Sequence, residues 1–169
     1  MDYAITFACY NQVDYTRQCI DSMQRAGTPL ERLVVVDNAS GDETLAYLRG
    51  LPLGKVIHNR DNLGCGVAWN QGALELQSEW TIIMNNDVLV SPQWVQGLIE
   101  SATLHQLDIV SPAMIEGPLN YDFNAFAQQA RQRAGSTMRL GWAHAVCLAV
   151  HQRVWKEVGY FRASPKLLG

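Results

Sequence analysis

Short apolar runs that alternate with amphipathic stretches constrain this chain more than any other feature. Residues 4–9, 33–36 and 80–84 are almost entirely apolar and are rich in β-branched or aromatic side chains. Runs of this length and composition are typical of strands buried on both faces, as the strands of parallel sheets are. Residues 55–58 and 109–110 are expected to add two further strands. The sequence therefore predicts an α/β fold, with a mostly parallel central sheet flanked by helices and joined by right-handed crossovers.

The stretches between these runs carry apolar residues at helical spacing. We expect the inner faces of four helices to contain Thr16, Cys19, Ile20, Met23, Leu45, Leu48, Val67, Leu74, Val95, Leu98, Ile99 and Ala102. Ser40 and Glu43 have the spacing of a capping box, and Ser91 before Pro92 is typical of an N-cap followed by the first residue of a helix. These signals predict where the second and fourth helices begin.

The last third of the chain is less regular. Residues 115–137 are polar with scattered aromatic side chains, and we expect an irregular excursion there that contains a helix. Residues 142–150 are predicted to form a final strand. Residues 153–158 are predicted to form a short helix that Gly159 closes.

Length, charge and apolar content bound the class of protein. The chain has 169 residues, which suits one domain, and its 48% hydrophobic and 17% charged residues are typical of a folded chain. The net charge is -3 and no Lys/Arg cluster is present, so nucleic acid is not expected as a partner. No apolar run reaches the ~18 residues of a membrane-spanning segment. We therefore expect a cytoplasmic protein that meets the inner face of a membrane only through its substrate.

Neither the cysteines nor the histidines match a catalytic or metal-binding signature. The cysteines form no C-x-x-C pair and have no histidine at zinc-ligand spacing: Cys9, Cys19, Cys65 and Cys147. We expect reduced and mostly buried thiols. His144 and Trp142 lie in the predicted last strand, where core packing is the more common role for both. The alternative is a pocket in which Trp142 stacks on a sugar.

Two aspartates follow predicted strands closely. Asp37 comes directly after residues 33–36, and Asp87 comes shortly after residues 80–84. The carboxyl ends of parallel strands form the edge at which such sheets bind ligands. Asp87 there suits Mg²⁺ or Mn²⁺ completed by phosphate oxygens, and Asp37 suits a ribose hydroxyl or a base N–H. The alternatives are a helix cap at Asp87 and an ordinary turn at Asp37.

A glycine-containing loop precedes the third predicted helix. Gly64 and Gly66 invite comparison with the dinucleotide fingerprint, but Trp69 occupies the position of its third glycine. A helix N-terminus after such a loop can still receive an anion, and Arg60 would add positive charge. A phosphate site and a plain loop are equally good interpretations of this segment.

Four stretches, in their order and spacing, resemble the family 2 glycosyltransferases of the GT-A fold over almost the whole chain. These stretches are FACYN at residues 7–11, VVVDNASGD at residues 34–42, NRDNLG at residues 59–64 and MNNDV at residues 84–88. The resemblance implies a GT-A fold that contains a Rossmann-like nucleotide-binding half. It also implies a single domain over residues 1–169, with a donor-binding half at residues 1–112 and the start of an acceptor half at residues 113–169.

The resemblance assigns a nucleotide-sugar site as well. In the family, the first two strand ends line the base and ribose, which here implies Tyr10, Asn11 and Asp37. The full set of residues expected to bind the nucleotide sugar is Tyr10, Asn11, Asp37, Asn38, Arg60, Asn62, Gly64 and Asn86. The metal motif of the family, commonly D-x-D, corresponds to Asn85-Asn86-Asp87, so Asp87 is the expected ligand of Mn²⁺ or Mg²⁺. This variant is similar to that of rhamnosyltransferase-like members, and one carboxylate holds a divalent ion more weakly than two.

The reaction implied by the resemblance is metal-assisted sugar transfer with inversion. The donor would be a nucleoside-diphosphate sugar (UDP, dTDP or GDP), and the acceptor a hydroxyl of a saccharide or lipid-linked molecule in polysaccharide assembly. The family's general base is a carboxylate soon after a segment that resembles residues 158–161. We therefore expect the base beyond Gly169, and a truncated chain that is inactive without it. The alternatives are a non-catalytic nucleotide-binding module and a nucleotidyltransferase.

Overall fold

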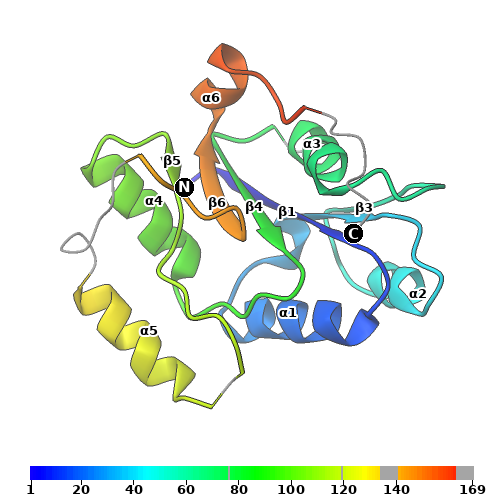
Figure 1. Ribbon diagram of the computed structural model, residues 1–169, viewed down its shortest axis with the longest axis horizontal. Coiled ribbons are helices and arrows are strands. Elements are labelled where there is room, and N and C mark those ends of the chain that lie inside the picture. The colour runs from blue at the N-terminus through cyan, green and yellow to red at the C-terminus, as the bar shows by residue number, and fades with distance from the viewer. Residues whose placement is uncertain (76, 119, 134–140, 163–169) are drawn as a thin grey trace.

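The computed structural model describes residues 1–75, 77–118, 120–133 and 141–162. Its six strands form one sheet (Figure 1). The strands are β1 (Tyr3–Cys9), β2 (Leu33–Asp37), β3 (Lys55–His58), β4 (Trp80–Asn85), β5 (Ile109–Val110) and β6 (Cys147–His151). The helices are α1 (Val13–Arg25), the 3-10 turn η1 (Leu30–Arg32), α2 (Thr44–Arg49), α3 (Cys65–Glu75), α4 (Trp94–Leu104), α5 (Phe123–Gln132) and α6 (Gln152–Glu157).

The strand order is β3-β2-β1-β4-β6-β5. The first four of these strands run parallel, whereas β6 is antiparallel to both of its neighbours, β4 and β5. The prediction of a mostly parallel sheet flanked by helices is confirmed. Because the four parallel strands end at one edge, the residues that follow Cys9, Asp37, His58 and Asn85 come together there. Residues 147–151 insert between β4 and β5, so the later part of the chain completes the sheet that the earlier part begins.

Helices cover both faces of the sheet, with α1 and α4 on one face and α3 on the other (Figure 1). Ile5 and Phe7 of β1 belong to a buried cluster that includes side chains of α1 and α4. The inner residues predicted for these two helices are all buried: Thr16, Cys19, Ile20, Met23, Val95, Leu98, Ile99 and Ala102. Helix α5 has no buried residue and lies outside α4 (Figure 1).

Helix α3 approaches the sheet through small residues. Its buried residues are Ala68, Gly72 and Ala73, whereas Leu74, predicted to face the core, is 53% exposed. A Cβ added to Gly72 would lie only 1.8 Å from Oγ1 of Thr6 in β1. There is no room at this contact for a larger side chain, so the helix turns its small residues inward and Leu74 outward. The prediction for Leu74 was wrong for this reason.

Several boundaries differ from the predicted ones. Strand β6 begins at Cys147, because residues 142–146 form an irregular segment whose Val146 carbonyl accepts from the backbone N–H of Asn85 (2.9 Å). Helix α4 begins at Trp94 instead of Pro92, since Gln93 has a left-handed φ of 61°. The helix expected within residues 115–137 is α5, and residues 134–137 of that stretch lie outside the described residues.

Among the described residues, no helix has both the length and the apolar character that crossing a membrane would require.

Candidate functional site

Hydrogen bonds join the loop that follows β1 to the loop that follows β2. The backbone N–H of Asn38 donates to the carbonyl of Cys9 (2.9 Å), directly linking the two strand ends. The N–H of Asn11 donates to Oγ of Ser40 (2.8 Å), and Oδ1 of Asn11 accepts from the N–H of Gly41 (2.7 Å). These bonds hold Asn11, Asn38 and Ser40 together at the carboxyl edge of the sheet.

Three non-glycine residues of these loops have a left-handed backbone. The φ angles are 56° at Asn11, 56° at Gln12 and 68° at Ala39. This conformation is uncommon outside glycine, and residues that keep it cluster at ligand-binding and catalytic sites. Tyr10 lies beside them and is 53% exposed. The edge formed by β1 and β2 is therefore a candidate binding site.

Ser40 belongs to this edge and does not cap α2 as predicted. The helix begins at Thr44, whose N–H donates to Oδ1 of Asp42 (3.0 Å), while Oδ2 of Asp42 accepts from the N–H of Val13 (3.1 Å). Burial by itself would raise the pKa of Asp42, but hydrogen bonds from Thr44 and Val13 outweigh it and lower the pKa. The capping-box prediction was wrong because Ser40 bonds to the loop after β1 and Asp42 takes the capping role.

Asp37 ends β2 as a fully buried carboxylate, with 0% exposure. Its Oδ2 lies 2.7 Å from Nδ1 of His58, and its Oδ1 accepts from the N–H of Ser40 (3.2 Å). His58 is opposite Asp37 in the register of β2 and β3, and 39% of its side chain is exposed. A ligand would reach the Asp37 carboxylate only after one of these partners moved. Direct contact between Asp37 and a nucleotide therefore stays a prediction.

Replacing His58 with leucine is expected to destabilise the protein by about 1–3 kcal/mol, because a buried carboxylate oxygen loses its hydrogen-bond donor. Urea denaturation would measure the change. His58→Gln keeps a side-chain donor and should lose less stability than His58→Leu. Equal stability of the leucine variant and the unchanged protein would show that the Asp37–His58 contact contributes nothing to the fold.

A network of side-chain amides connects this edge to α3. Nδ2 of Asn59 donates to Oδ1 of Asn38 (2.8 Å) and to Oε1 of Gln71 (2.9 Å), and Nε2 of Gln71 donates back to Oδ1 of Asn59 (2.9 Å). Nδ2 of Asn38 reaches the carbonyl of Gly64 (3.4 Å), and the N–H of Gly64 donates to Oδ1 of Asn62 (3.0 Å). Asn38 and Asn59 are buried. The network fixes the glycine loop against the ends of β2 and β3.

The segment after β4 offers the second part of the site. Asp87 lies in the turn beyond the strand and is exposed. The side chain of Asn86 points to α1, where its Nδ2 donates to Oγ1 of Thr16 (3.0 Å). Because β4 lies two strand spacings from β2, its end is about 10 Å from that of β2. A nucleoside diphosphate is long enough to span this distance along the edge, whereas a diphosphate alone is not.

A hollow of ≈ 420 Å³ opens beside the end of β4. Its lining consists of Trp69, Asn85, Trp142, Ala143, His144, Ala145 and Val146. Trp142 is 63% exposed and meets the ring of His144 edge-on, with centroids 5.1 Å apart. Nε2 of His144 also lies 3.4 Å from Oε1 of Glu116. The favoured prediction of core packing for Trp142 and His144 was therefore wrong, since both line a surface hollow.

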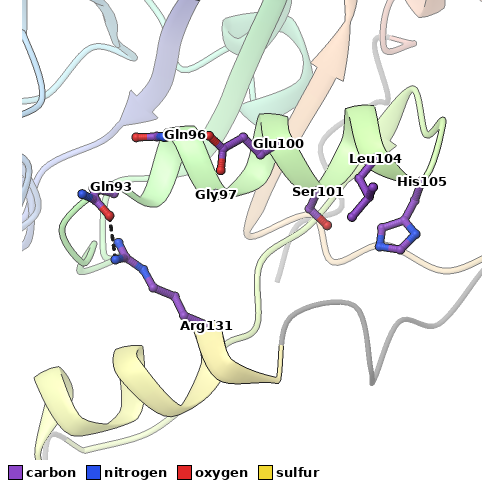
Figure 2. A pocket seen from close by; sticks show the side chains of 8 residues that line it. All are labelled: Gln93, Gln96, Gly97, Glu100, Ser101, Leu104, His105 and Arg131. Carbon is purple, nitrogen blue, oxygen red and sulfur yellow. Dashed lines mark hydrogen bonds between the residues drawn. The ribbon is translucent and has the colours of Figure 1, made fainter.

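Another hollow, of ≈ 300 Å³, lies between α4 and α5 (Figure 2). It is lined by Gln93, Gln96, Gly97, Glu100, Ser101, Leu104, His105 and Arg131. Figure 2 shows Arg131 of α5 reaching toward Gln93, to whose Oε1 its guanidinium donates (2.7 Å). The guanidinium also donates to the carbonyl of Pro92. None of these residues was predicted for the site, and the contacts join two helices. We therefore place the candidate site at the strand ends.

The cysteines take no part in the proposed chemistry. Burial raises the pKa of the Cys9, Cys19 and Cys147 thiols to about 12. These thiols stay protonated at neutral pH, and the reactive form of cysteine is the thiolate. All four cysteines are free, and Cys65 is exposed. The prediction of reduced and mostly buried thiols is confirmed.

Comparison with known proteins decides the family. The model of the family described as "Glycosyl transferase family 2" matches residues 5–163, which include both parts of the candidate site. The chain belongs to this family. The predicted resemblance to family 2 glycosyltransferases is confirmed.

The chain is also similar to a curated protein and to solved structures. The chain is 31% identical over 120 residues to "Succinoglycan biosynthesis protein ExoO" of Rhizobium meliloti (strain 1021), a match that covers 65% of this chain and 34% of that protein. The structure of the mannosyltransferase PcManGT from Pyrobaculum calidifontis in complex with GDP-Man and Mn²⁺ superposes with a TM-score of 0.71 at 17% identity, covering 96% of this chain and 48% of that one. S. aureus TarS in complex with UDP gives 0.69 at 18% identity, covering 99% and 52%. The GT-A fold is confirmed, and the chain spans about a third to a half of these relatives.

The residues after β4 fit a metal ion whose ligands come mainly from a substrate. No group of three or more His, Cys, Asp or Glu side chains within the described ranges could hold a metal alone. One exposed carboxylate at Asp87 nevertheless suits Mg²⁺ or Mn²⁺, because these ions take one or two carboxylates and complete their shell with water and phosphate oxygens. Asp87 as the ligand of this ion stays a prediction.

The structure brings most of the predicted site residues to one edge. Tyr10, Asn11, Asp37, Asn38, Asn62 and Gly64 lie in or beside the loops after β1, β2 and β3, and Asn86 and Asp87 follow β4. Arg60 is exposed in the loop after β3. Sequence reasoning missed His58 as the partner of Asp37 and missed Gln71. The one available signal was positional, since His58 ends the strand after the one that Asp37 ends.

Proposed function

We propose that this chain carries the donor-binding part of a glycosyltransferase. The enzyme would transfer a sugar from a nucleoside-diphosphate sugar to an acceptor hydroxyl. The observation that carries the proposal is one edge of the sheet that holds the Asn11–Asp37 loops and, after the neighbouring strand β4, the exposed Asp87. A tryptophan-lined hollow opens beside Asn85 at the end of the same strand. Base and ribose would bind at the first part, the diphosphate near Asp87, and the sugar in the hollow.

In the proposed reaction, the acceptor oxygen forms a bond to the anomeric carbon on the face opposite the leaving group. The bond from that carbon to the diphosphate breaks, its electron pair stays on the diphosphate, and the configuration inverts. The hydroxyl proton passes to a carboxylate that acts as the general base. A divalent ion held by Asp87 would neutralise charge on the leaving diphosphate, and Arg60 would add a positive charge.

Similar proteins support more specific proposals about the donor and the acceptor. Solved neighbours bind GDP-Man and UDP-GlcNAc, which supports a nucleoside-diphosphate sugar as donor; UDP, dTDP and GDP stay the predicted nucleotides. The name of the curated relative supports a saccharide or lipid-linked acceptor in polysaccharide assembly. We retain residues 1–112 as the donor half and residues 113–169 as the start of an acceptor half. The single carboxylate in Asn85-Asn86-Asp87 supports a rhamnosyltransferase-like subtype, and a cytoplasmic location stays a prediction.

A non-catalytic nucleotide-binding module is the second candidate. The observation that favours it is the single carboxylate after β4, in a chain without a cluster of three metal-binding side chains among its described residues. Such a module would bind the same ligands but would not accelerate sugar transfer. Turnover by the protein with its complete reading frame would separate the two candidates.

Calorimetric titration with UDP, GDP and dTDP, with and without Mn²⁺, tests the donor site. We expect the affinity for one nucleoside diphosphate to be at least about tenfold higher with Mn²⁺ than without it, since the ion would link Asp87 to the phosphate oxygens. Absence of binding by all three diphosphates in both conditions would refute the donor site. Release of pyrophosphate from a nucleoside triphosphate would instead support a nucleotidyltransferase.

A further inference from the structure

Asn70 of α3 holds the segment that leaves α6. Its Nδ2 donates to the carbonyl of Phe161 (2.7 Å), and the N–H of Phe161 donates to its Oδ1 (3.0 Å). One side chain thus satisfies both backbone groups of a residue outside any helix or strand. We call this pair of bonds the Asn70 clamp.

Aromatic rings pack around the clamped residue. The ring of Phe161 lies 5.6 Å from that of Trp69 and 6.0 Å from that of Trp155, measured between centroids. Trp155 in turn stacks on Tyr160 at 5.2 Å with an interplanar angle of 10°. Trp69 also lines the hollow beside Asn85. The residue that Asn70 clamps therefore supports a ring that forms part of the hollow.

The clamped segment also crosses the first turn of α3. A Cβ on Gly66 would lie 3.5 Å from Cβ of Phe161 and 3.6 Å from the carbonyl oxygen of Arg162. Two residues before Gly66, the carbonyl of Gly64 accepts from the side chain of Asn38. The clamp thus holds the segment after α6 against the first turn of α3 and beside the hollow, while the bond from Asn38 separately holds the loop before that turn.

We propose that Asn70 is a positioning residue for the sugar of the donor. By clamping Phe161, it keeps Trp69 in the wall of the hollow, where the apolar face of a hexose would meet the indole ring. In the proposed binding mode the nucleoside diphosphate does not touch Trp69, so we expect the clamp to change its binding much less than that of the sugar. This inference rests on the proposed function, and it concerns a residue whose amide is fully engaged with Phe161.

The test compares the affinity for a sugar nucleotide with the affinity for the same nucleotide without its sugar. Calorimetry would measure the binding of UDP-GlcNAc and UDP, and of GDP-mannose and GDP. The proteins would be the unchanged chain, Asn70→Ala, Asn70→Asp and the control Asn124→Ala. Asn124 is an exposed asparagine of α5. We expect Asn70→Ala to weaken sugar-nucleotide binding about tenfold, since two hydrogen bonds are lost, and to change diphosphate binding less than about twofold. Asn70→Asp keeps the acceptor for Phe161 and loses the donor, so an intermediate loss is expected.

The hydrogen-exchange rate of the backbone N–H of Phe161 provides a second readout. This rate should increase in Asn70→Ala, because the N–H loses its acceptor. If Asn70→Ala does not fold, the isosteric Asn70→Asp carries the comparison. An unchanged ratio of sugar-nucleotide to diphosphate affinity, or equal weakening of both, would overturn the inference while leaving the donor site intact. Absence of diphosphate binding by the unchanged protein would overturn the proposed function itself, and this inference with it.

Discussion

Asp87→Asn is expected to reduce sugar transfer by about 100-fold or more in the protein with its complete reading frame, because the leaving diphosphate loses its main electrostatic stabilisation. The side chain is exposed, so the free energy of unfolding should change by less than about 0.5 kcal/mol. The same variant should lose the Mn²⁺-dependent increase in diphosphate affinity, which calorimetry measures without turnover.

Asp21→Asn is the matched control for this experiment. Asp21 is an exposed carboxylate of α1, and the same isosteric change removes the same charge from the protein. If both variants lowered transfer equally, net charge would explain the effect and Asp87 would not be the metal ligand. Full Mn²⁺-dependent binding by Asp87→Asn would also contradict the assignment.

Gly72→Ala is expected to destabilise the protein by about 3 kcal/mol, since the contact between α3 and β1 is already closed. The new Cβ would lie 1.8 Å from Oγ1 and 2.7 Å from Cβ of Thr6, a buried residue of a central strand. Rotation about χ1 of Thr6 would move Oγ1 but not Cβ, whose position is fixed by the backbone of the central strand. Chemical denaturation followed by circular dichroism would measure the loss.

The chain provides a control for this glycine in α4. Gly97 also lies inside a helix, but a Cβ added there meets no atom within 4 Å. Gly97→Ala should therefore stabilise the protein by about 0.5–1 kcal/mol through helix propensity alone. Thr6→Ala in the Gly72→Ala background should recover part of the stability by removing Oγ1. If Gly72→Ala behaved like Gly97→Ala, the close approach of α3 to β1 would be refuted.

The sequence-based predictions were correct where the pattern lies within one segment, and wrong where the outcome depends on a contact with a distant segment. The apolar runs of β1, β2 and β4 and the inner residues of α1 and α4 were predicted correctly, because side-chain period and run length are properties of one segment. Leu74 and Ser40 were assigned wrongly for the opposite reason. The orientation of α3 depends on its contact with Thr6, and the hydroxyl of Ser40 bonds to Asn11, which is 29 positions away.

For the candidate site, the sequence alone determined that polar residues follow the buried strands, and thus that Asn11, Asp37 and Asp87 lie at one edge of a parallel sheet. Only the tertiary structure decided what each side chain does there. It buried the Asp37 carboxylate against His58, exposed Asp87, and placed Trp142 in a hollow instead of the core. The physical reason is that the position of each strand follows from its local hydrophobic pattern, whereas burial and hydrogen-bond partners depend on segments that meet only when the chain folds.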